Sequence, residues 1–451
     1  MQSKILIATT TWWPLAARLA AAFGGLGAHV SAICPLGSPV AVVGSVRGIF
    51  RYSALSPTRS IEAALREVEP DLVVPCDERA VAHLHELHAS TPQGEFPRRL
   101  IERSLGAPGG YATVLSRGAS LELAAREGIA EPESRVLRSA ADVRTWCAER
   151  SLPTVMKADG SWGGAGVEVV DGPGTAVAAF RRMSRPLATW RVAKFLLSNR
   201  DPFPLRGWLR RERPAVIGQD FIRGRAANIM VACWEGEVIA TAGAVVLETA
   251  KQFGAATIIR PVVNADMETA ARRLVRRLGM SGFCGVDFVL EEGTGKAWMI
   301  ELNPRATQLG HLAIGPSGTL AAALLARLRD EVGRGEVRHG AAQPRITQET
   351  VAFFPQAWLS GTVSPLLRPA YHDVPWEEPA LVAELMRRPW DGRSLLARLT
   401  DTLMRRPDSE RILAASVAHM HPPEPGLTEV AAARAIVDVG ADPVPASGDV
   451  R

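Results

Sequence analysis

A predicted β-hairpin around the turn Glu291–Gly295 carries acidic and amide side chains that suit a metal site. Asp287 lies on its first strand, and Glu301 and Asn303 lie on its second. A strand alternates its side chains, so Glu301 and Asn303 share one face. A register with Asp287 near Glu301 gathers oxygen ligands that Mg²⁺ prefers. The alternative is an ordinary hairpin with solvent-facing acids.

A glycine-rich loop follows the short strand that ends near Lys157. Such a loop lets backbone N–H groups approach phosphate oxygens, and the lysine supplies a compact positive charge. Lys157 stands out because only five of the 52 basic residues are lysine. Glycine-rich hairpins are common, so this loop indicates phosphate binding only in combination with the hairpin. Its small residues are Gly160, Ser161, Gly163, Gly164 and Gly166.

The first 110 residues alternate apolar strands with helices, which is typical of βαβ units and a parallel sheet. The glycine cluster Gly24–Gly27 follows a helix, whereas a dinucleotide-binding fingerprint follows a strand. This placement disfavours a nicotinamide dehydrogenase. The predicted strands are Lys4–Ala8, His29–Cys34 and Asp71–Pro75, and the predicted helices are Leu15–Phe23 and Ile61–Val68.

Two acids follow the strand that ends at Pro75. Ligands gather at the carboxyl ends of parallel strands, so Asp77 and Glu78 are candidates to face a substrate. Asp77 is equally well placed to cap the next helix. Cys76 has no evident base partner and is disfavoured as a nucleophile.

The composition is that of a globular chain with ample core. Of 451 residues, 47% are hydrophobic and 22% charged. We find no apolar run of the ~20 residues that a membrane-spanning helix needs, and no secretory signal. Five cysteines without CxxC spacing disfavour a disulfide framework and a zinc site. We therefore expect a cytoplasmic protein without membrane contact.

Positive charge is concentrated in one segment. The formal net charge is +5, and basic residues are dense over 181–225. This segment either attracts an anionic substrate or forms a solvated arginine-rich helix pair. No nucleic-acid-binding signature is present, so we expect no nucleic-acid partner.

These features divide the chain into four predicted parts. An N-terminal α/β domain covers 1–110. A first lobe over 111–218 contains the glycine-rich loop and a basic insert at 184–215, and a second lobe over 219–335 contains the acidic hairpin. The remainder, 336–451, is a proline-rich extension of irregular pattern whose tail is expected to be partly disordered.

Taken together, these segments resemble the ATP-grasp superfamily, in the branch of biotin carboxylase, carbamoyl-phosphate synthetase and D-alanine–D-alanine ligase. The resemblance covers about 1–330, and its most specific part is Glu301-Leu302-Asn303-Pro304-Arg305 together with Asp287. It implies an N-terminal parallel-sheet domain, a mobile lid and a central antiparallel ATP-binding lobe.

The resemblance also implies roles for individual residues. Lys157 and the 160–166 loop match the phosphate-binding lysine and lid, and Asp287, Glu301 and Asn303 match the ligands for Mg²⁺ or Mn²⁺. Arg305 would clamp a carboxylate or the developing phosphate. The positions matching nucleotide contacts are Arg117, where the family has lysine, the hinge residues Gln219, Asp220, Phe221 and Ile222, and Asn228, where an acid often binds ribose.

The implied activity is an ATP-dependent ligase that activates a carboxylate as an acylphosphate for attack by an amine. Its partners would be small-molecule acids and amines. The sequence does not decide whether the protein forms a homodimer. The alternatives are a bicarbonate-activating enzyme of the carboxylase or carbamoyl-phosphate type, and an ATP-binding module without turnover. The sequence does not identify the acid or the amine.

Overall fold

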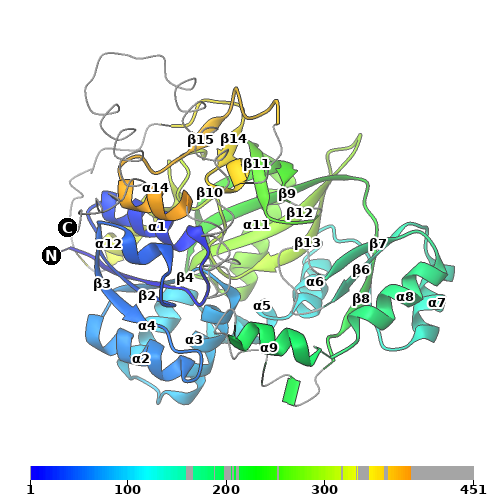
Figure 1. Ribbon diagram of the computed structural model, residues 1–451, viewed down its shortest axis with the longest axis horizontal. Helices are drawn as coiled ribbons and strands as arrows, with labels where there is room; N and C mark the ends of the chain where they lie inside the picture. The colour runs from blue at the N-terminus through cyan, green and yellow to red at the C-terminus, as the bar shows by residue number, and fades with distance from the viewer. Residues whose placement is uncertain are drawn as a thin grey trace, which may run out of the picture.

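The computed structural model of the chain contains three β-sheets with helices packed around them (Figure 1). Residues 387–451, which include the predicted disordered tail, lie outside the described residues. The structure describes residues 2–158, 166–186, 188–197, 205, 208–209, 213–250, 253–315, 318–331, 333, 345–359 and 364–386.

The N-terminal domain is a parallel four-stranded sheet in the order β3-β2-β1-β4. Its central strands are buried because helices cover both faces, which explains their continuous apolar sequence. The strands are β1 (Lys4–Ala8), β2 (His29–Cys34), β3 (Val46–Arg51) and β4 (Leu72–Pro75). The helices are α1 (Pro14–Gly25), η1 (Pro39–Val42), α2 (Pro57–Val68), α3 (Glu78–Ser90), α4 (Phe96–Leu105) and η2 (Pro108–Gly110).

The second sheet, called the N-lobe sheet below, is antiparallel in the order β5-β8-β6-β7. Two helices cover one of its faces, where Trp146 is fully buried. Its strands are β5 (Ser134–Leu137), β6 (Thr154–Ala158), β7 (Val167–Val170) and β8 (Val216–Asp220). The two helices that pack on it are α7 (Ala140–Glu149) and α8 (Pro173–Met183). Of the other helices of this region, α5 (Tyr111–Val114) and α6 (Arg117–Arg126) precede β5 in the chain and α9 (Thr189–Leu197) follows α8.

The third sheet, called the C-lobe sheet below, has the order β13-β12-β9-β10-β11-β14-β15. Each pair of adjacent strands in this sheet is antiparallel, except the pair β14 and β15, which is parallel. Its strands are β9 (Gly224–Trp234), β10 (Glu237–Thr249), β11 (Ala256–Pro261), β12 (Gly282–Glu291), β13 (Ala297–Asn303), β14 (Val351–Phe353) and β15 (Tyr371–Asp373). The helices are α11 (Ala265–Leu278), α12 (Leu320–Glu331), α13 (Gln356–Leu359) and α14 (Pro379–Met386).

The chain after residue 345 is part of this architecture. The sequence pattern there is irregular, yet β14 and β15 extend the C-lobe sheet. Asp373 at the end of β15 is fully buried, where it pairs with Arg18 of α1 and accepts a hydrogen bond from His311 Nε2 at 2.8 Å. This buried group joins the extension to the N-terminal domain and to the loop after β13.

Two hydrophobic cores hold the C-lobe sheet. One face packs against α1, α12 and the N-terminal domain through residues such as Met230, Ala232 and Trp234. The other face packs against α11 and α6 through residues such as Val231 and Phe288. The N-terminal domain and the C-lobe sheet therefore share one continuous core, which fixes their relative position.

Candidate functional site

The predicted acidic hairpin is formed by β12 and β13, with Asp287 directly opposite Glu301. A β-bulge interrupts the pairing next to Asp287, between it and Phe288. Directly opposed residues of an antiparallel pair point to the same face, so the two carboxylates share one face of the sheet. Burial and the negative charge of Glu301 raise the pKa of Asp287 to about 6. The two carboxylates therefore repel each other, and a bound cation would reduce this repulsion.

Two amide side chains hold the Asp287 carboxylate from either side. Asn228 Nδ2 donates to one carboxylate oxygen at 2.6 Å, and Asn303 Nδ2 donates to the other at 2.9 Å. The opposite end of the Asn228 amide accepts a hydrogen bond from the Thr307 hydroxyl at 3.1 Å. The structure therefore places Asn228 beside the carboxylate pair, and its expected contact with ribose stays a prediction.

Two arginines flank the same carboxylates. Arg117 Nη2 lies 2.5 Å from Glu301 Oε1, although the two residues are 184 positions apart. Arg305 Nη2 donates to Asn303 Oδ1 and to Glu78 Oε1, both at 3.1 Å. Arg117 thus lies at the predicted metal ligands, which is the end of the site where a nucleotide would place its phosphates.

Lys157 reaches this cluster from the N-lobe sheet. It lies on β6 with 7% of its surface exposed. Burial and the nearby Arg117 lower its pKa to about 8, against the opposing influence of Glu301 and Asp287. These electrostatic influences act between the two sheets, so Lys157 lies near the carboxylate pair at the junction between the lobes.

The hinge residues follow from the same strand pairing. Lys157 is opposite Ile217, and Val155 is opposite Gln219, so Gln219 lies on the same face of the N-lobe sheet as Lys157. Its side chain donates to the Ser134 hydroxyl at 2.9 Å. The opposite face carries Thr154 and the helix core.

The segment after Asp220 connects the two lobes. The strand β8 ends at Asp220 and β9 begins at Gly224, with neither helix nor strand between them. Phe221 is 39% exposed, and Arg223 O accepts a hydrogen bond from Glu292 N at 2.9 Å. The predicted hinge thus occupies the crossing between the sheets.

The structure describes only part of the predicted lid. Gly160, Ser161, Gly163 and Gly164 lie outside the described residues. Gly166 is described, and its carbonyl accepts a hydrogen bond from Ala158 N at 2.8 Å. This bond closes the base of the predicted loop between β6 and β7, next to Lys157.

The acids after β4 have different positions. The Asp77 side chain caps α3 by accepting from Ala80 N, and it also accepts from the backbone and hydroxyl of Thr10. Of its two predicted roles, the structure shows the helix cap. Glu78 instead bonds to Arg305. Burial raises the pKa of the Cys76 thiol far above its usual range, which disfavours a thiolate nucleophile.

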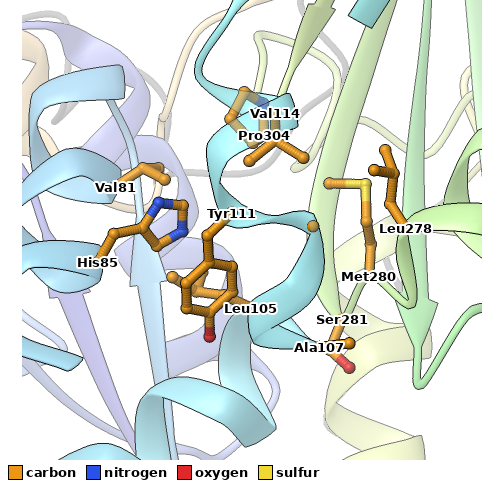
Figure 2. Close-up of a pocket in the computed structure, with 11 residues that line it drawn as sticks. Val81, His85, Leu105, Ala107, Tyr111, Val114, Leu278, Met280, Ser281 and Pro304 are labelled. Carbon is orange, nitrogen blue, oxygen red and sulfur yellow. The ribbon is translucent and has the colours of Figure 1, made fainter. Parts of the chain in front are cut away.

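A separate pocket lies where α3, α5 and the start of β12 meet (Figure 2). It is mainly apolar, with Val81, Met280 and Pro304 among its lining residues. The His85 ring stacks on Tyr111 with 3.8 Å between ring centroids, and burial lowers the pKa of His85 to about 4. The pocket contains none of the predicted site residues.

The sequence analysis did not identify two residues whose side chains hold predicted site residues in place. Thr307 lies two residues beyond Arg305 and bonds to Asn228, and Ser134 holds Gln219. Proximity to the acidic hairpin was a usable signal for Thr307. For Ser134 no sequence signal was available, because its partner lies 85 residues away.

The donor set of the cluster fits a hard divalent cation. Among the described residues there is no group of three or more His, Cys, Asp or Glu side chains that could hold a metal. A cation here would instead use the carboxylates of Asp287 and Glu301, which are oxygen donors of the type that Mg²⁺ prefers. The amide oxygen of Asn303 accepts from Arg305 in this structure and would join them once the amide group turns over. Burial and the neighbouring charge of Glu301 raise the pKa of Asp287, and the positive charge of such an ion would act against both effects.

Comparison with known proteins agrees with this geometry. Residues 202–308 match the family described as the ATP-grasp domain. The computed structure superimposes on N5-carboxyaminoimidazole synthase from Aspergillus clavatus with a TM-score of 0.52 and 14% identity, over 72% of this chain and 77% of the other. That structure contains ADP and 5-aminoimidazole ribonucleotide.

Biotin carboxylases are also similar in fold. The biotin carboxylase domain of the Hydrogenobacter thermophilus 2-oxoglutarate carboxylase gives a TM-score of 0.51 and 14% identity, covering 77% of this chain and 71% of the other. The Campylobacter jejuni enzyme gives 0.51 and 14%, covering 76% and 72%. The chain therefore has the ATP-grasp fold, which confirms the predicted fold class and agrees with the resemblance seen in the sequence.

No curated protein matches the sequence. Within the described residues, every helix is too short or too polar to cross a lipid bilayer.

Proposed function

We propose that the protein is an ATP-dependent ligase that joins a carboxylate to an amine and releases ADP and phosphate. The observation that carries this proposal is the direct opposition of Asp287 and Glu301 on one face of the C-lobe sheet, with the buried Lys157 of the N-lobe sheet near enough for both carboxylates to raise its pKa. A lysine facing two carboxylates suits a phosphate chain whose charge is shared between side-chain cations and a metal ion.

ATP would lie between the N-lobe and C-lobe sheets. The hinge over Gln219–Ile222 would contact the base, and Lys157 with the 160–166 loop would bind the phosphates. Asp287, Glu301 and Asn303 would hold Mg²⁺ or Mn²⁺, which supplies charge neutralisation when bound. Phosphoryl transfer needs mainly positioning and electrostatic stabilisation, which such a set provides.

The proposed reaction has two steps. A carboxylate oxygen of the substrate attacks the γ-phosphorus, and the bond to the β-phosphate oxygen breaks, so that ADP leaves. The amine nitrogen then attacks the acyl carbon, the bond to the phosphate oxygen breaks, and the amine proton passes to solvent. Arg305 would hold the carboxylate or the developing phosphate, because a guanidinium offers two parallel donors.

The structural neighbours support a ligase in general terms. One was crystallised with ADP and an amine-bearing ribonucleotide, and another with MgADP and bicarbonate. Both are about 14% identical to this chain, so their substrates are not assigned to it. The carboxylate and the amine of this protein are the open part of the proposal.

A substrate screen tests the proposal. Wild-type protein is incubated with ATP, Mg²⁺ and pairs of amino acids or dicarboxylates, and ADP release is measured, followed by mass spectrometry of the product. We expect ADP release that requires a carboxylate and a product heavier by the amine minus water. ADP release with bicarbonate alone would favour the bicarbonate-activating alternative, and ATP binding without any turnover would favour a binding module.

A further inference from the structure

Residues 304–312, called the β13 loop below, follow the last strand of the acidic hairpin and form neither helix nor strand. The loop contains Arg305 and Thr307, and the Thr307 hydroxyl donates to Asn228 Oδ1 at 3.1 Å. Asn228 in turn donates to the Asp287 carboxylate at 2.6 Å. A segment without regular backbone pairing depends on tertiary contacts for its position. The geometry of the proposed site therefore depends on what holds this loop.

Both ends of the β13 loop are held by distant parts of the chain. Near its start, Ala306 N donates to Pro75 O at the end of β4, at 3.3 Å. Near its end, His311 is 7% exposed and its Nε2 lies 2.8 Å from Asp373 Oδ2. Asp373 is the last residue of β15, so this second contact comes from the chain after residue 345.

The charges around Asp373 make this contact a strong one. The carboxylate is 3% exposed, and its other oxygen pairs with Arg18 of α1. Burial opposes its ionisation, but Arg18 and His311 hold the pKa of Asp373 below its ordinary value. Burial lowers the pKa of His311, so the ring is neutral at neutral pH. An ionised carboxylate only accepts, so His311 Nε2 is the donor of a buried, charge-assisted hydrogen bond.

We propose that Asp373 is a positioning residue, through which the chain after residue 345 fixes the β13 loop. Asp373 acts through His311 and the loop, and not by contact with a ligand. Because the same carboxylate binds Arg18, the N-terminal domain, the β13 loop and the C-terminal strands meet at one side chain. The effect on the site rests on the proposed function, since the loop carries Arg305 and the Thr307 contact to Asn228.

Substitutions of His311 break the bond without separating Asp373 from Arg18. His311→Leu removes the donor, and we expect amide hydrogens of the β13 loop to exchange about 10- to 100-fold faster. His311→Gln places an amide N–H near the position of Nε2, so its exchange should return toward that of wild type. His311→Asn is too short to reach Asp373 and gives the same test if His311→Leu does not fold. Hydrogen–deuterium exchange with mass spectrometry measures the loop in the ligand-free protein.

A second measurement reports on the proposed site. Mn²⁺ is titrated in the presence of a non-hydrolysable ATP analogue, and electron paramagnetic resonance measures the free ion. We expect about 10-fold weaker Mn²⁺ binding by His311→Leu, because a displaced Thr307 no longer holds Asn228 against Asp287. His311→Gln should bind Mn²⁺ nearly as tightly as wild type, a recovery that a loss of packing alone would not produce.

His88→Leu is the matched control. His88 is 5% exposed, and its Nε2 lies 2.7 Å from Glu102 Oε1 within the N-terminal domain. The substitution thus removes a buried histidine–carboxylate bond of the same kind away from the β13 loop. We expect loop exchange and Mn²⁺ affinity equal to those of wild type. Circular dichroism confirms the fold of each variant.

The outcomes separate this inference from the proposed function. Unchanged loop exchange in the folded His311→Leu or His311→Asn variant would overturn the inference, and so would faster exchange with unchanged Mn²⁺ affinity. An equal loss of Mn²⁺ affinity in His88→Leu would overturn it too, because general destabilisation would then explain the effect. Failure of wild type to bind Mn²⁺ with the analogue would refute the proposed function, and this inference with it.

Discussion

Arg117 forms an ion pair with Glu301 that joins the start of α6 to the end of the acidic hairpin. Arg117 occupies the position where the family resemblance has a lysine, and Glu301 is a predicted metal ligand. The pair brings together an anticipated nucleotide contact and an anticipated metal ligand in the ligand-free protein. The guanidinium therefore partly neutralises the carboxylate that a divalent cation would need.

Removing Arg117 should strengthen metal binding in the absence of nucleotide. The loss of a positive charge next to Glu301 raises the affinity for a cation, and we expect Arg117→Ala to bind Mn²⁺ about 10-fold more tightly. Titration followed by electron paramagnetic resonance measures free Mn²⁺. Arg126→Ala, at the other end of the same helix, serves as the control. Weaker Mn²⁺ binding by Arg117→Ala would contradict the proposed metal site.

Neutralising Glu301 should stop turnover without unfolding the protein. Glu301→Gln keeps the side-chain shape but removes one carboxylate charge, and we expect ADP release to fall by about 10²- to 10³-fold. Glu301 is partly exposed and raises the pKa of Asp287, so its neutralisation relieves a repulsion. The control is Glu292→Gln in the turn of the same hairpin. Retained turnover in Glu301→Gln would remove Glu301 from the metal ligands.

Replacing Arg305 with lysine should weaken use of the carboxylate substrate. A lysine carries a single nitrogen and cannot bind a carboxylate through two parallel bonds as a guanidinium does. We expect kcat/KM for the carboxylate to fall about 10- to 100-fold with the KM for ATP unchanged. Steady-state kinetics of ADP release measure both, with the exposed Arg272→Lys as control. Equal kinetics would exclude the clamp.

The stability of the protein should fall between pH 7 and pH 5, partly through His85. Its pKa is about 4 in the folded state, below the ordinary value near 6.5, because burial disfavours the charged ring. The unfolded chain then binds more protons, so stability is lost as the pH falls through 6.5 toward 4.

A substitution isolates this contribution. His85→Phe keeps the stack on Tyr111 but cannot titrate. We expect wild type to lose about 1 kcal/mol more than His85→Phe between pH 7 and pH 5, a value reduced for the partial exposure of the ring. Urea unfolding at the two pH values provides the free energies. An identical pH dependence in both proteins would show that His85 does not contribute.

The hairpin and its chemistry were predictable because they are local. Asp287 and Glu301 are separated by a single turn, and alternation along each strand decides which side chains share a face. The parallel N-terminal sheet was predictable for a similar reason, since continuous apolar runs such as Lys4–Ala8 are typical of strands buried on both faces. The hydrophobic pattern thus predicted the parallel N-terminal sheet and the acidic hairpin, whereas the ATP-grasp fold class was what the family resemblance implied.

The tertiary structure decided which distant groups meet those candidates. The contacts of Arg117 with Glu301 and of Arg305 with Glu78 join residues 184 and 227 positions apart, and no periodicity encodes such separations. Asp77 caps α3 through a local bond from Ala80 N, and the fold adds the loop after β1, from which the backbone and hydroxyl of Thr10 donate to the same carboxylate. The chain after residue 345 is attached to the C-lobe sheet by backbone pairing of β14 with β11. Such pairing depends on an available sheet edge and not on the side-chain pattern.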